Sequence, residues 1–596
     1  MANAFRFVLL SFLLVVAPAQ EIAGTWFTTR GVLELEGKPD SLRGRYGDNC
    51  TLTGTAKGKE LRFEAKEGQV TLEAKLTIDK SGHRFTGEWT TANGKGTWRG
   101  WRHDPAAEKG KAPSVAGFWR TGWGVLELEQ QGNKLKGGIG SQGWTTVRGD
   151  LKGRTIELTY ESALGNGTFQ LDVDSDGKQA VGHATWAQGK GALQAQRLEG
   201  HARKVTPKPG AIVAGLGQNR LVYWLRAPKT WKPGQSLPLL VFLHGSNYCS
   251  KPYVETIGSS PLGDRYLVVG IDGERWDESS APGDPRQNYT YANFMGKSTY
   301  EGYPNTHRES PALVAELLEE LQKQHHCSRT FVGGHSQGGF LSWFFAMHYP
   351  DLVQGVFPMS SGMTMQCEPD VFADAALRSK QRNVAIAVVH GRNDDVVGFS
   401  QGEGTFRSCQ EQAFPILRLF ANEAGHAFIA LPWIEAVQWL ETMSSSDAAA
   451  LAKAGRAALD EDHFRDVMAI VLRLRAIAPT DPVAKELAAK VDEYADGDAE
   501  RFTKALAEPG DGAWIDDFLA FRDKFEFADR ARDVMAKFAT LRAEHEGPAK
   551  KLFDAARAKF NKGDRDGGWS TYAELVRDCW ASSWAPRVKR WIADRK

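Results

Sequence analysis

A serine surrounded by glycines lies where a buried strand is expected to meet a buried helix. Phe331 and Val332 are apolar, glycines at 333, 334, 338 and 339 flank the run His335-Ser336-Gln337, and an apolar stretch begins at Phe340. A sharp strand-to-helix turn brings its two elements so close that side chains larger than glycine do not fit. The segment therefore predicts a strand, a tight turn with Ser336 exposed on it, and a helix.

Two later segments place an acid and a histidine directly after buried strands. Val384–Val389 is an apolar run followed by Asp394, and Ile416–Phe420 is followed by His426. A serine hydroxyl is a weak nucleophile at neutral pH, so a histidine must take its proton and a carboxylate must orient that histidine. The order along the chain predicts a catalytic triad with Ser336 as nucleophile, Asp394 as acid and His426 as base.

Two neighbouring residues remain as alternatives within this triad. Asp395 follows Asp394 directly and could supply the carboxylate, and His390 could supply the imidazole. Either aspartate could also simply cap a turn, and His426 could be an ordinary loop histidine.

An upstream turn predicts the second half of an anion-binding site. Leu239–Leu243 is a short apolar run, typical of a buried strand, and it leads into the polar turn at 244–247. Backbone N–H groups in such a turn and at a helix N-terminus can bind the oxyanion that forms during acyl transfer. We expect this oxyanion hole to consist of the N–H groups of Gln337, Gly245 and Ser246. The predicted reaction needs no metal and no cofactor.

The segment from Gln218 to Met443 resembles the α/β-hydrolase superfamily. Its closest resemblance is to secreted esterases of the feruloyl esterase and polyhydroxybutyrate depolymerase-like group, and to the carboxylesterase and phospholipase type. The motifs that carry the resemblance are Leu243-His244-Gly245-Ser246-Asn247, Gly334-His335-Ser336-Gln337-Gly338-Gly339, His390-Gly391-Arg392-Asn393-Asp394 and Gly425-His426.

This resemblance implies a mostly parallel sheet and the hydrolysis of carboxylic esters through an acyl-enzyme. The substrate would be a small-molecule ester or an ester linked to a carbohydrate or another polymer. A serine peptidase or amidase could use the same triad, because similar elbow glycines occur in prolyl-peptidase-like enzymes. A non-enzymatic scaffold or carbohydrate-binding protein is the third alternative.

The N-terminus has the pattern of a secretory signal peptide. Arg6 precedes an apolar run at 7–16, and Ala17-Pro18-Ala19 ends it with small residues suited to cleavage. The run is shorter than the roughly 20 apolar residues that a membrane span needs, although an uncleaved anchor remains an alternative. We therefore expect a signal peptide over 1–19, cleavage after Ala19, a secreted or periplasmic protein and no membrane span in its mature form.

The length and charge of the chain favour several globular domains. At 596 residues the chain exceeds what one hydrophobic core usually serves, and 42% of its residues are hydrophobic. The net charge is +1, and no basic patch interleaved with aromatic residues indicates nucleic-acid binding. The six cysteines lack metal-ligand spacing, so either free thiols or one or two disulfides are compatible with the pattern.

Residues 22–26 and 31–36 repeat, with few changes, at 115–119 and 124–129. Short alternating runs separated by Gly, Asn and Asp turns follow in both copies, which is typical of a meander of half-buried strands. The repeat predicts two tandem all-β modules, at 20–104 and 113–200, each an up-and-down barrel or a small sandwich. Exposed indole rings could stack on sugars, although core packing is the commoner role of such tryptophans; the modules contain Trp89, Trp98, Trp101, Trp123, Trp144 and Trp186.

Residues 206–443 are expected to form the α/β-hydrolase domain, and 447–596 an all-α region of helical hairpins. In this last part apolar residues recur at helical spacing, for example at 464, 467, 470, 471 and 474. Such an array of hairpins, which loosely resembles a helical repeat, could bind a protein partner, cover the catalytic domain or only add stability. A long aromatic segment between 266 and 310 is expected to form a wall of the active site; it contains Trp276, Tyr289, Tyr291, Phe294, Tyr300 and Tyr303.

Overall fold

The computed structural model describes residues 22–46, 50–67, 70–92, 94–111, 113–140, 145–162, 165–187, 189–276, 289–291, 310–363, 369–510 and 512–593. These residues form two compact units. One contains the chain up to His201 together with 274–276 and 289–290, and the other contains the remainder.

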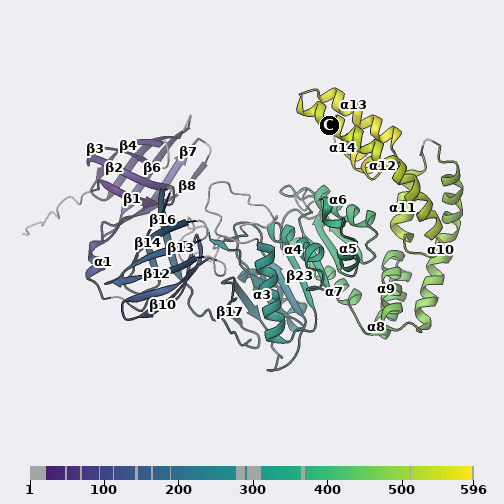
Figure 1. Cartoon of the computed structure of the whole chain (residues 1–596), viewed down its shortest axis with the longest axis horizontal. Coiled ribbons are helices and arrows are strands. Elements are labelled where there is room, and N and C mark those ends of the chain that lie inside the picture. The colour runs from purple at the N-terminus through teal and green to yellow at the C-terminus, as the bar shows by residue number, and fades with distance from the viewer. Residues whose placement is uncertain are drawn as a thin grey trace, which may run out of the picture. The chain divides into compact units, whose positions relative to one another are not determined.

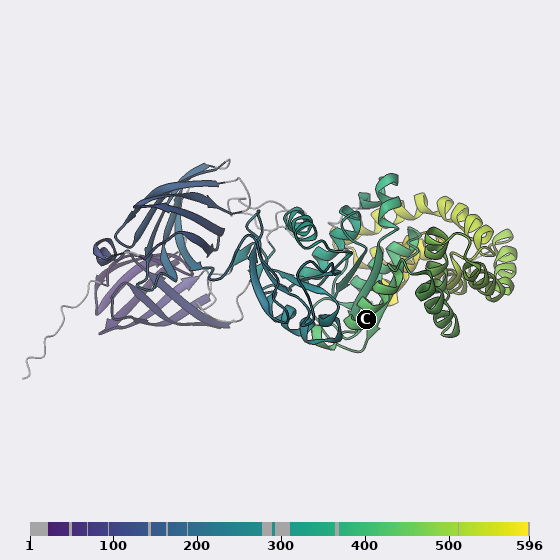
Figure 2. The ribbon, with the colours of Figure 1, turned by 90° about the horizontal axis from the view of Figure 1, so that it is seen from below.

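The first unit consists of two closed barrels, each made of eight strands in antiparallel pairing with their neighbours (Figure 2). The repeat in the sequence therefore encodes a barrel and not a sandwich. The strands of the first barrel are β1 (Gly24–Thr28), β2 (Gly31–Lys38), β3 (Ser41–Tyr46), β4 (Cys50–Lys57), β5 (Glu60–Glu67), β6 (Val70–Ile78), β7 (Arg84–Thr91) and β8 (Gly94–Trp101). Those of the second are β9 (Gly117–Thr121), β10 (Gly124–Gln131), β11 (Lys134–Ile139), β12 (Thr145–Lys152), β13 (Thr155–Ser162), β14 (Gly165–Val173), β15 (Gln179–Trp186) and β16 (Gly189–Arg197).

Alternating apolar side chains fill the interior of each barrel, as the strand periodicity predicts. Trp26 and Trp119 are buried at equivalent positions of the repeat, and each donates its indole N–H to the carbonyl four residues earlier, Ile22 or Val115. Of the six tryptophans singled out in the sequence, the rings of Trp98 and Trp101 are buried. Trp89, Trp123 and Trp186 are partly buried against the barrel cores, and Trp144 lies outside the described residues.

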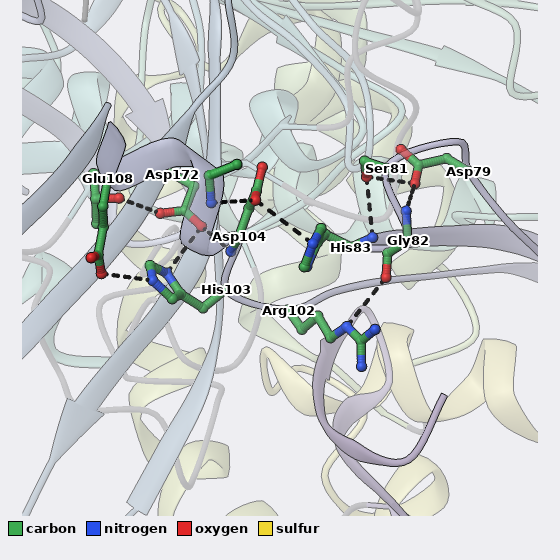
Figure 3. A network of polar contacts seen from close by, with 11 residues as sticks. Asp79, Ser81, Gly82, His83, Arg102, His103, Asp104, Glu108 and Asp172 are labelled. Carbon is green, nitrogen blue, oxygen red and sulfur yellow. Dashed lines mark hydrogen bonds and ion pairs between the residues drawn. The ribbon is translucent and has the colours of Figure 1, made fainter. Parts of the chain in front are cut away.

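Polar contacts fix the linker between the barrels (Figure 3). The ring of His103 lies 3.0 Å from a Glu108 oxygen and 3.1 Å from an oxygen of Asp172 on β14. The N–H of Asp104 donates to the same Asp172 carboxylate at 2.8 Å. On the other side, His83 in the β6–β7 turn lies 3.7 Å from Asp104. The linker, which includes the short helix α1 (Pro105–Lys109), is thus bound to both barrels.

The second unit contains an eight-stranded sheet in the order β17-β18-β20-β19-β23-β24-β25-β26. Figure 1 labels two of its strands, β17 and β23. The pairs β17–β18 and β18–β20 are antiparallel, and the other five are parallel. Its strands are β17 (Ile212–Leu216), β18 (Val222–Arg226), β19 (Leu239–Leu243), β20 (Leu267–Ile271), β23 (Thr330–His335), β24 (Gly355–Met359), β25 (Ala385–Gly391) and β26 (Leu417–Asn422). A separate two-residue pair, β21 (Arg275–Trp276) and β22 (Tyr289–Thr290), belongs to the first unit.

Every residue of β19, β20, β23, β24 and β25 is buried, as expected for strands covered on both faces. Two separate hydrophobic clusters occupy the two faces of the sheet: Val241 of β19 belongs to one, and Phe242 to the other. The helices associated with the sheet are α2 (Lys251–Ser259), α3 (Ser310–His325), α4 (Gln337–His348), α5 (Ala375–Gln381), α6 (Phe399–Glu411) and α7 (Trp433–Met443).

The C-terminal part is all-α, as the periodicity predicts. Asp447 begins it by accepting the N–H groups of Ala449 and Ala450 at the start of α8. The helices are α8 (Ala448–Asp460), α9 (Phe464–Ile477), α10 (Pro482–Ala507), α11 (Ile515–Phe525), α12 (Arg532–Asn561), α13 (Arg565–Asp578) and α14 (Trp584–Ala593). One continuous hydrophobic cluster includes side chains of β19, β25 and α7 together with those of α8 to α12. These helices therefore extend the hydrophobic core on the side of the sheet where α7 packs.

The described cysteines, Cys50, Cys249, Cys327, Cys409 and Cys579, form no disulfide with one another, and Cys367 lies outside the described residues. Within the same part of the chain, no helix has the length and apolar character required to cross a membrane.

Candidate functional site

Ser336 lies at a sharp turn between β23 and α4, as predicted. Its backbone has φ 54° and ψ −117°, a conformation that costs a non-glycine residue about 1–3 kcal/mol. A Cβ at Gly334 would overlap the backbone of Gly338, and one at Gly338 would overlap the carbonyl of Leu243. The flanking glycines are therefore required by close backbone packing, and the N–H of Ser336, bonded to Met359 O at 3.0 Å, holds the turn against β24.

Asp394 and His426 are in direct contact. Asp394 follows β25, His426 follows β26, and Nδ1 of the histidine lies 2.9 and 2.8 Å from the two carboxylate oxygens. The N–H groups of Val396 and Val397 donate to the same carboxylate at 3.0 and 2.8 Å. Burial acts to raise the pKa of Asp394, but the hydrogen bonds from His426 and Val397 outweigh it and hold that pKa below its ordinary value.

The structure separates Asp394 and His426 from the two alternatives in the sequence. Asp395 is exposed to solvent, whereas the imidazole of His426 contacts the preceding residue, Asp394. His390 is fully buried behind the acid, where its Nε2 donates to Val397 O at 2.8 Å and lies 3.6 Å from Asp394. Burial lowers the pKa of His390. This histidine therefore supports the turn that carries Asp394.

Two of the three residues expected to form the oxyanion hole lie close to Ser336. Gln337 is the first residue of α4, so its N–H is one of those at the helix N-terminus without a partner inside the helix. A Cβ placed on Gly245 would lie only 3.4 Å from the Cβ of Ser336, which puts the turn after β19 directly beside the serine. Ser246, the next residue, is exposed.

The turn that carries Gly245 is fixed by His244, which is fully buried. Its Nδ1 lies 2.6 Å from the carbonyl of Gly245, and its Nε2 accepts the N–H of Gly273 at 2.9 Å. Burial lowers the pKa of His244. A neutral ring with its proton on Nδ1 satisfies both contacts.

Tyr291 has a structural role that differs from the expected one. Its ring is fully buried, and its hydroxyl donates to Ile271 O at 2.7 Å and accepts the N–H of His244. It therefore packs beneath the turn and is no part of an exposed wall. Three other aromatic residues of this segment lie outside the described residues: Phe294, Tyr300 and Tyr303. The structure describes only the backbone of Trp276 and Tyr289.

Sequence reasoning gave no role to His335, the residue before the serine. Its Nε2 lies 2.7 Å from the carbonyl oxygen of His426, and the two imidazole rings have centroids 4.6 Å apart. Burial, together with the nearby His426, lowers the pKa of His335 to about 4. The only sequence signal was its place inside the Gly-x-Ser-x-Gly motif.

Comparison with known proteins identifies the fold of the central segment. Residues 238–401 match the family model described as the alpha/beta hydrolase fold. The central domain is therefore an α/β hydrolase, and the predicted resemblance to this superfamily is confirmed.

Sequence relatives and solved structures cover parts of the chain. It is 26% identical over 207 residues, or 33% of its length, to the bifunctional acetylxylan esterase/xylanase XynS20E of Neocallimastix patriciarum. The match covers 24% of that relative. Acyl-protein thioesterase 2 of Zea mays matches 37% of this chain and 99% of its own at 16% identity and a TM-score of 0.28. A ferulic acid esterase matches 38% of this chain and 93% of its own at 15% identity and a TM-score of 0.28.

Among the residues that the structure describes, no group of three or more His, Cys, Asp or Glu side chains is arranged to hold a metal ion.

Proposed function

We propose that this protein is a secreted serine hydrolase that cleaves carboxylic esters through an acyl-enzyme. The observation that carries the proposal is the contact of His426 with Asp394, on loops at the same end of the sheet as the strained turn of Ser336. A histidine oriented by a carboxylate is the feature that turns a serine hydroxyl into a nucleophile.

In the proposed reaction, the Oγ of Ser336 attacks the ester carbonyl while Nε2 of His426 accepts its proton. Asp394 keeps the proton of His426 on Nδ1 and stabilises the imidazolium that forms. His426 then protonates the leaving alcohol, which leaves the acyl group on Ser336. Water, activated by the same histidine, hydrolyses this acyl-enzyme and releases the acid.

The oxyanion that forms in each half of the reaction needs hydrogen-bond donors in fixed positions. We assign this role to the N–H groups of Gln337 and Gly245, with Ser246 as a further donor from the same turn. The rigid hydrogen bonds of His244 support the assignment, because donors held in place before the reaction stabilise an oxyanion most strongly.

The relative with an acetylxylan esterase name favours acyl groups on polysaccharides as substrates to test first. We further propose that the partly buried indoles of the barrels contact carbohydrate. The helical C-terminal part is proposed to bind a protein partner.

Export of the protein can be tested by finding the chain, shortened after Ala19, outside the cytoplasm of the producing cell.

The test compares the purified protein with its Ser336→Ala variant on p-nitrophenyl acetate, methyl ferulate, acetylated xylan and a peptide anilide. Ser400→Ala, at an exposed serine on α6, is the matched control. We expect ester turnover in the parent and the control, and a loss of about 10³-fold or more in Ser336→Ala. Cleavage of the anilide alone would assign the protein to the peptidases, and equal rates for all three proteins would contradict a serine mechanism.

A further inference from the structure

The side chain of His335 is bonded to one part of the candidate site and lies beside another, while its backbone belongs to a third. It is the last residue of β23, directly before Ser336. Its Nε2 lies 2.7 Å from the carbonyl oxygen of His426, on the loop of the proposed base. Its Nδ1 lies 3.6 Å from the position of a Cβ placed on Gly245, in the proposed oxyanion turn. His335 therefore adjoins the serine in the chain, is hydrogen-bonded to the loop of the proposed base and lies beside the proposed oxyanion turn.

The protonation state of His335 follows from its surroundings. Its side chain is buried, and its pKa of about 4 keeps the ring neutral at neutral pH. A neutral imidazole has one N–H, and a carbonyl oxygen can only accept a hydrogen bond. The proton must therefore be on Nε2, which donates to the backbone of His426.

The loop that carries His426 leaves β26 at Asn422, and Asn393 holds it before Gly425 by donating to the carbonyls of Glu423 and Ala424. Gly425 then gives the chain wide backbone freedom, and the bond from His335 holds the loop after this glycine. Asp394 holds only one end of the ring, at Nδ1. A ring fixed at this single point could pivot, and its other nitrogen, Nε2, is the atom that must meet the serine. The hydrogen bond from His335 fixes the backbone from which the ring extends.

We propose that His335 is a positioning residue that sets the backbone of His426, and hence the direction of its imidazole, relative to Ser336. The inference rests on the proposed serine-hydrolase function. It implies that losing the hydrogen bond lowers the rate of the chemical step while leaving substrate binding unchanged, because the bond orients the base and touches no substrate.

Two substitutions separate this role from simple packing. His335→Phe keeps a planar ring and removes the donor, whereas His335→Gln carries its Nε2 the same number of bonds from Cβ as the native donor. We expect His335→Phe to lower kcat for p-nitrophenyl acetate about 10- to 100-fold with KM within about twofold. His335→Gln should recover most of the rate. His325→Phe is the matched control, since burial also lowers the pKa of His325 to about 4 and it lies at the end of α3.

Labelling by a fluorophosphonate reagent distinguishes failure of the inference from failure of the function. If the parent protein is neither labelled at Ser336 nor active on any ester, the proposed function is wrong, and the role of His335 falls with it. If the parent is labelled but His335→Phe is labelled and turns over ester at the same rate, only the positioning role is wrong. A folded His335→Gln that is as slow as His335→Phe would also overturn it, because the donor would then not be the cause.

Discussion

The guanidinium of Arg418, on β26, lies 2.6 Å from the carboxylate of Asp466, on α9. Asp466 is 9% exposed and Arg418 32%, so the pair is largely shielded from water. It joins the last strand of the sheet to the C-terminal helices, and Arg465, next to Asp466, donates to Phe414 O just before the same strand. Because β26 leads to His426, these helices contribute to the framework of the candidate site.

Breaking this ion pair from one side should destabilise the second unit. We expect Asp466→Asn to lower the free energy of unfolding by about 1–3 kcal/mol, because Arg418 then remains partly buried without its counter-charge. Urea unfolding followed by tryptophan fluorescence measures the change. The double variant Arg418→Met, Asp466→Leu should recover most of the loss; a double variant as unstable as Asp466→Asn would show that the pair itself is not the cause.

Replacing the proposed acid should reduce the chemical step without weakening binding. In Asp394→Asn the amide no longer favours the imidazole with its proton on Nδ1, so we expect kcat on p-nitrophenyl acetate to fall by about 10³- to 10⁴-fold with little change in KM. Asp395→Asn, at the adjacent exposed aspartate, should keep the parent rate. A comparable loss in both variants would mean that the structure has assigned the wrong carboxylate.

The three proposed catalytic residues could be predicted from the sequence because each lies next to a strand that the sequence itself indicates. Ser336, Asp394 and His426 directly follow apolar strands, and the parallel arrangement of strands brings such positions to one edge. His335 and Tyr291 could not be assigned in this way, since their roles depend on partners 91 and 20 residues away in the chain. Likewise, the repeat predicts strands, but barrel closure depends on pairing of β1 with β8 and of β9 with β16.

Two exposed apolar side chains near the site predict a preference among acyl groups. Among the described residues, four large apolar side chains are exposed, and two of them, Val396 (67%) and Ile429 (79%), are two and three residues after Asp394 and His426. We expect Ile429→Asn to lower kcat/KM for p-nitrophenyl hexanoate about 3- to 10-fold relative to the acetate, because a longer acyl chain loses apolar contact. Leu472→Asn, on α9, is the control. An unchanged hexanoate-to-acetate ratio would exclude Ile429 from acyl recognition.

Acid should destabilise the second unit partly through His335. Its pKa is about 4 in the folded protein and 6.5 as an ordinary histidine, so the unfolded chain binds the proton more tightly. The contribution of neutral His335 to the free energy of unfolding is therefore present above about pH 6.5 and is lost as the pH falls toward 4. The difference between the two pKa values corresponds to roughly 3 kcal/mol of this free energy. Urea unfolding at pH 7 and pH 4.5 should show a smaller loss of stability for His335→Gln than for the parent; equal losses would contradict this contribution.

The two barrels should move as one body because a buried hydrogen bond joins them. The indole N–H of Trp101, at the end of β8, donates to the carbonyl of Gly182 on β15 at 2.6 Å, and Phe27 stacks on His183 with ring centroids 4.3 Å apart. Trp101→Phe leaves that carbonyl without its donor, which costs about 1–3 kcal/mol.

We expect Trp101→Phe to make the linker at 102–116 more accessible, so limited proteolysis there should accelerate severalfold while the barrels themselves remain resistant. Phe27→Leu should have a smaller effect, because it removes ring stacking but leaves the hydrogen bond. His103→Gln tests the polar side of the same junction, where the imidazole contacts Glu108 and Asp172. If Trp101→Phe is cleaved at the parent rate, the polar contacts of the linker hold the barrels together without the indole.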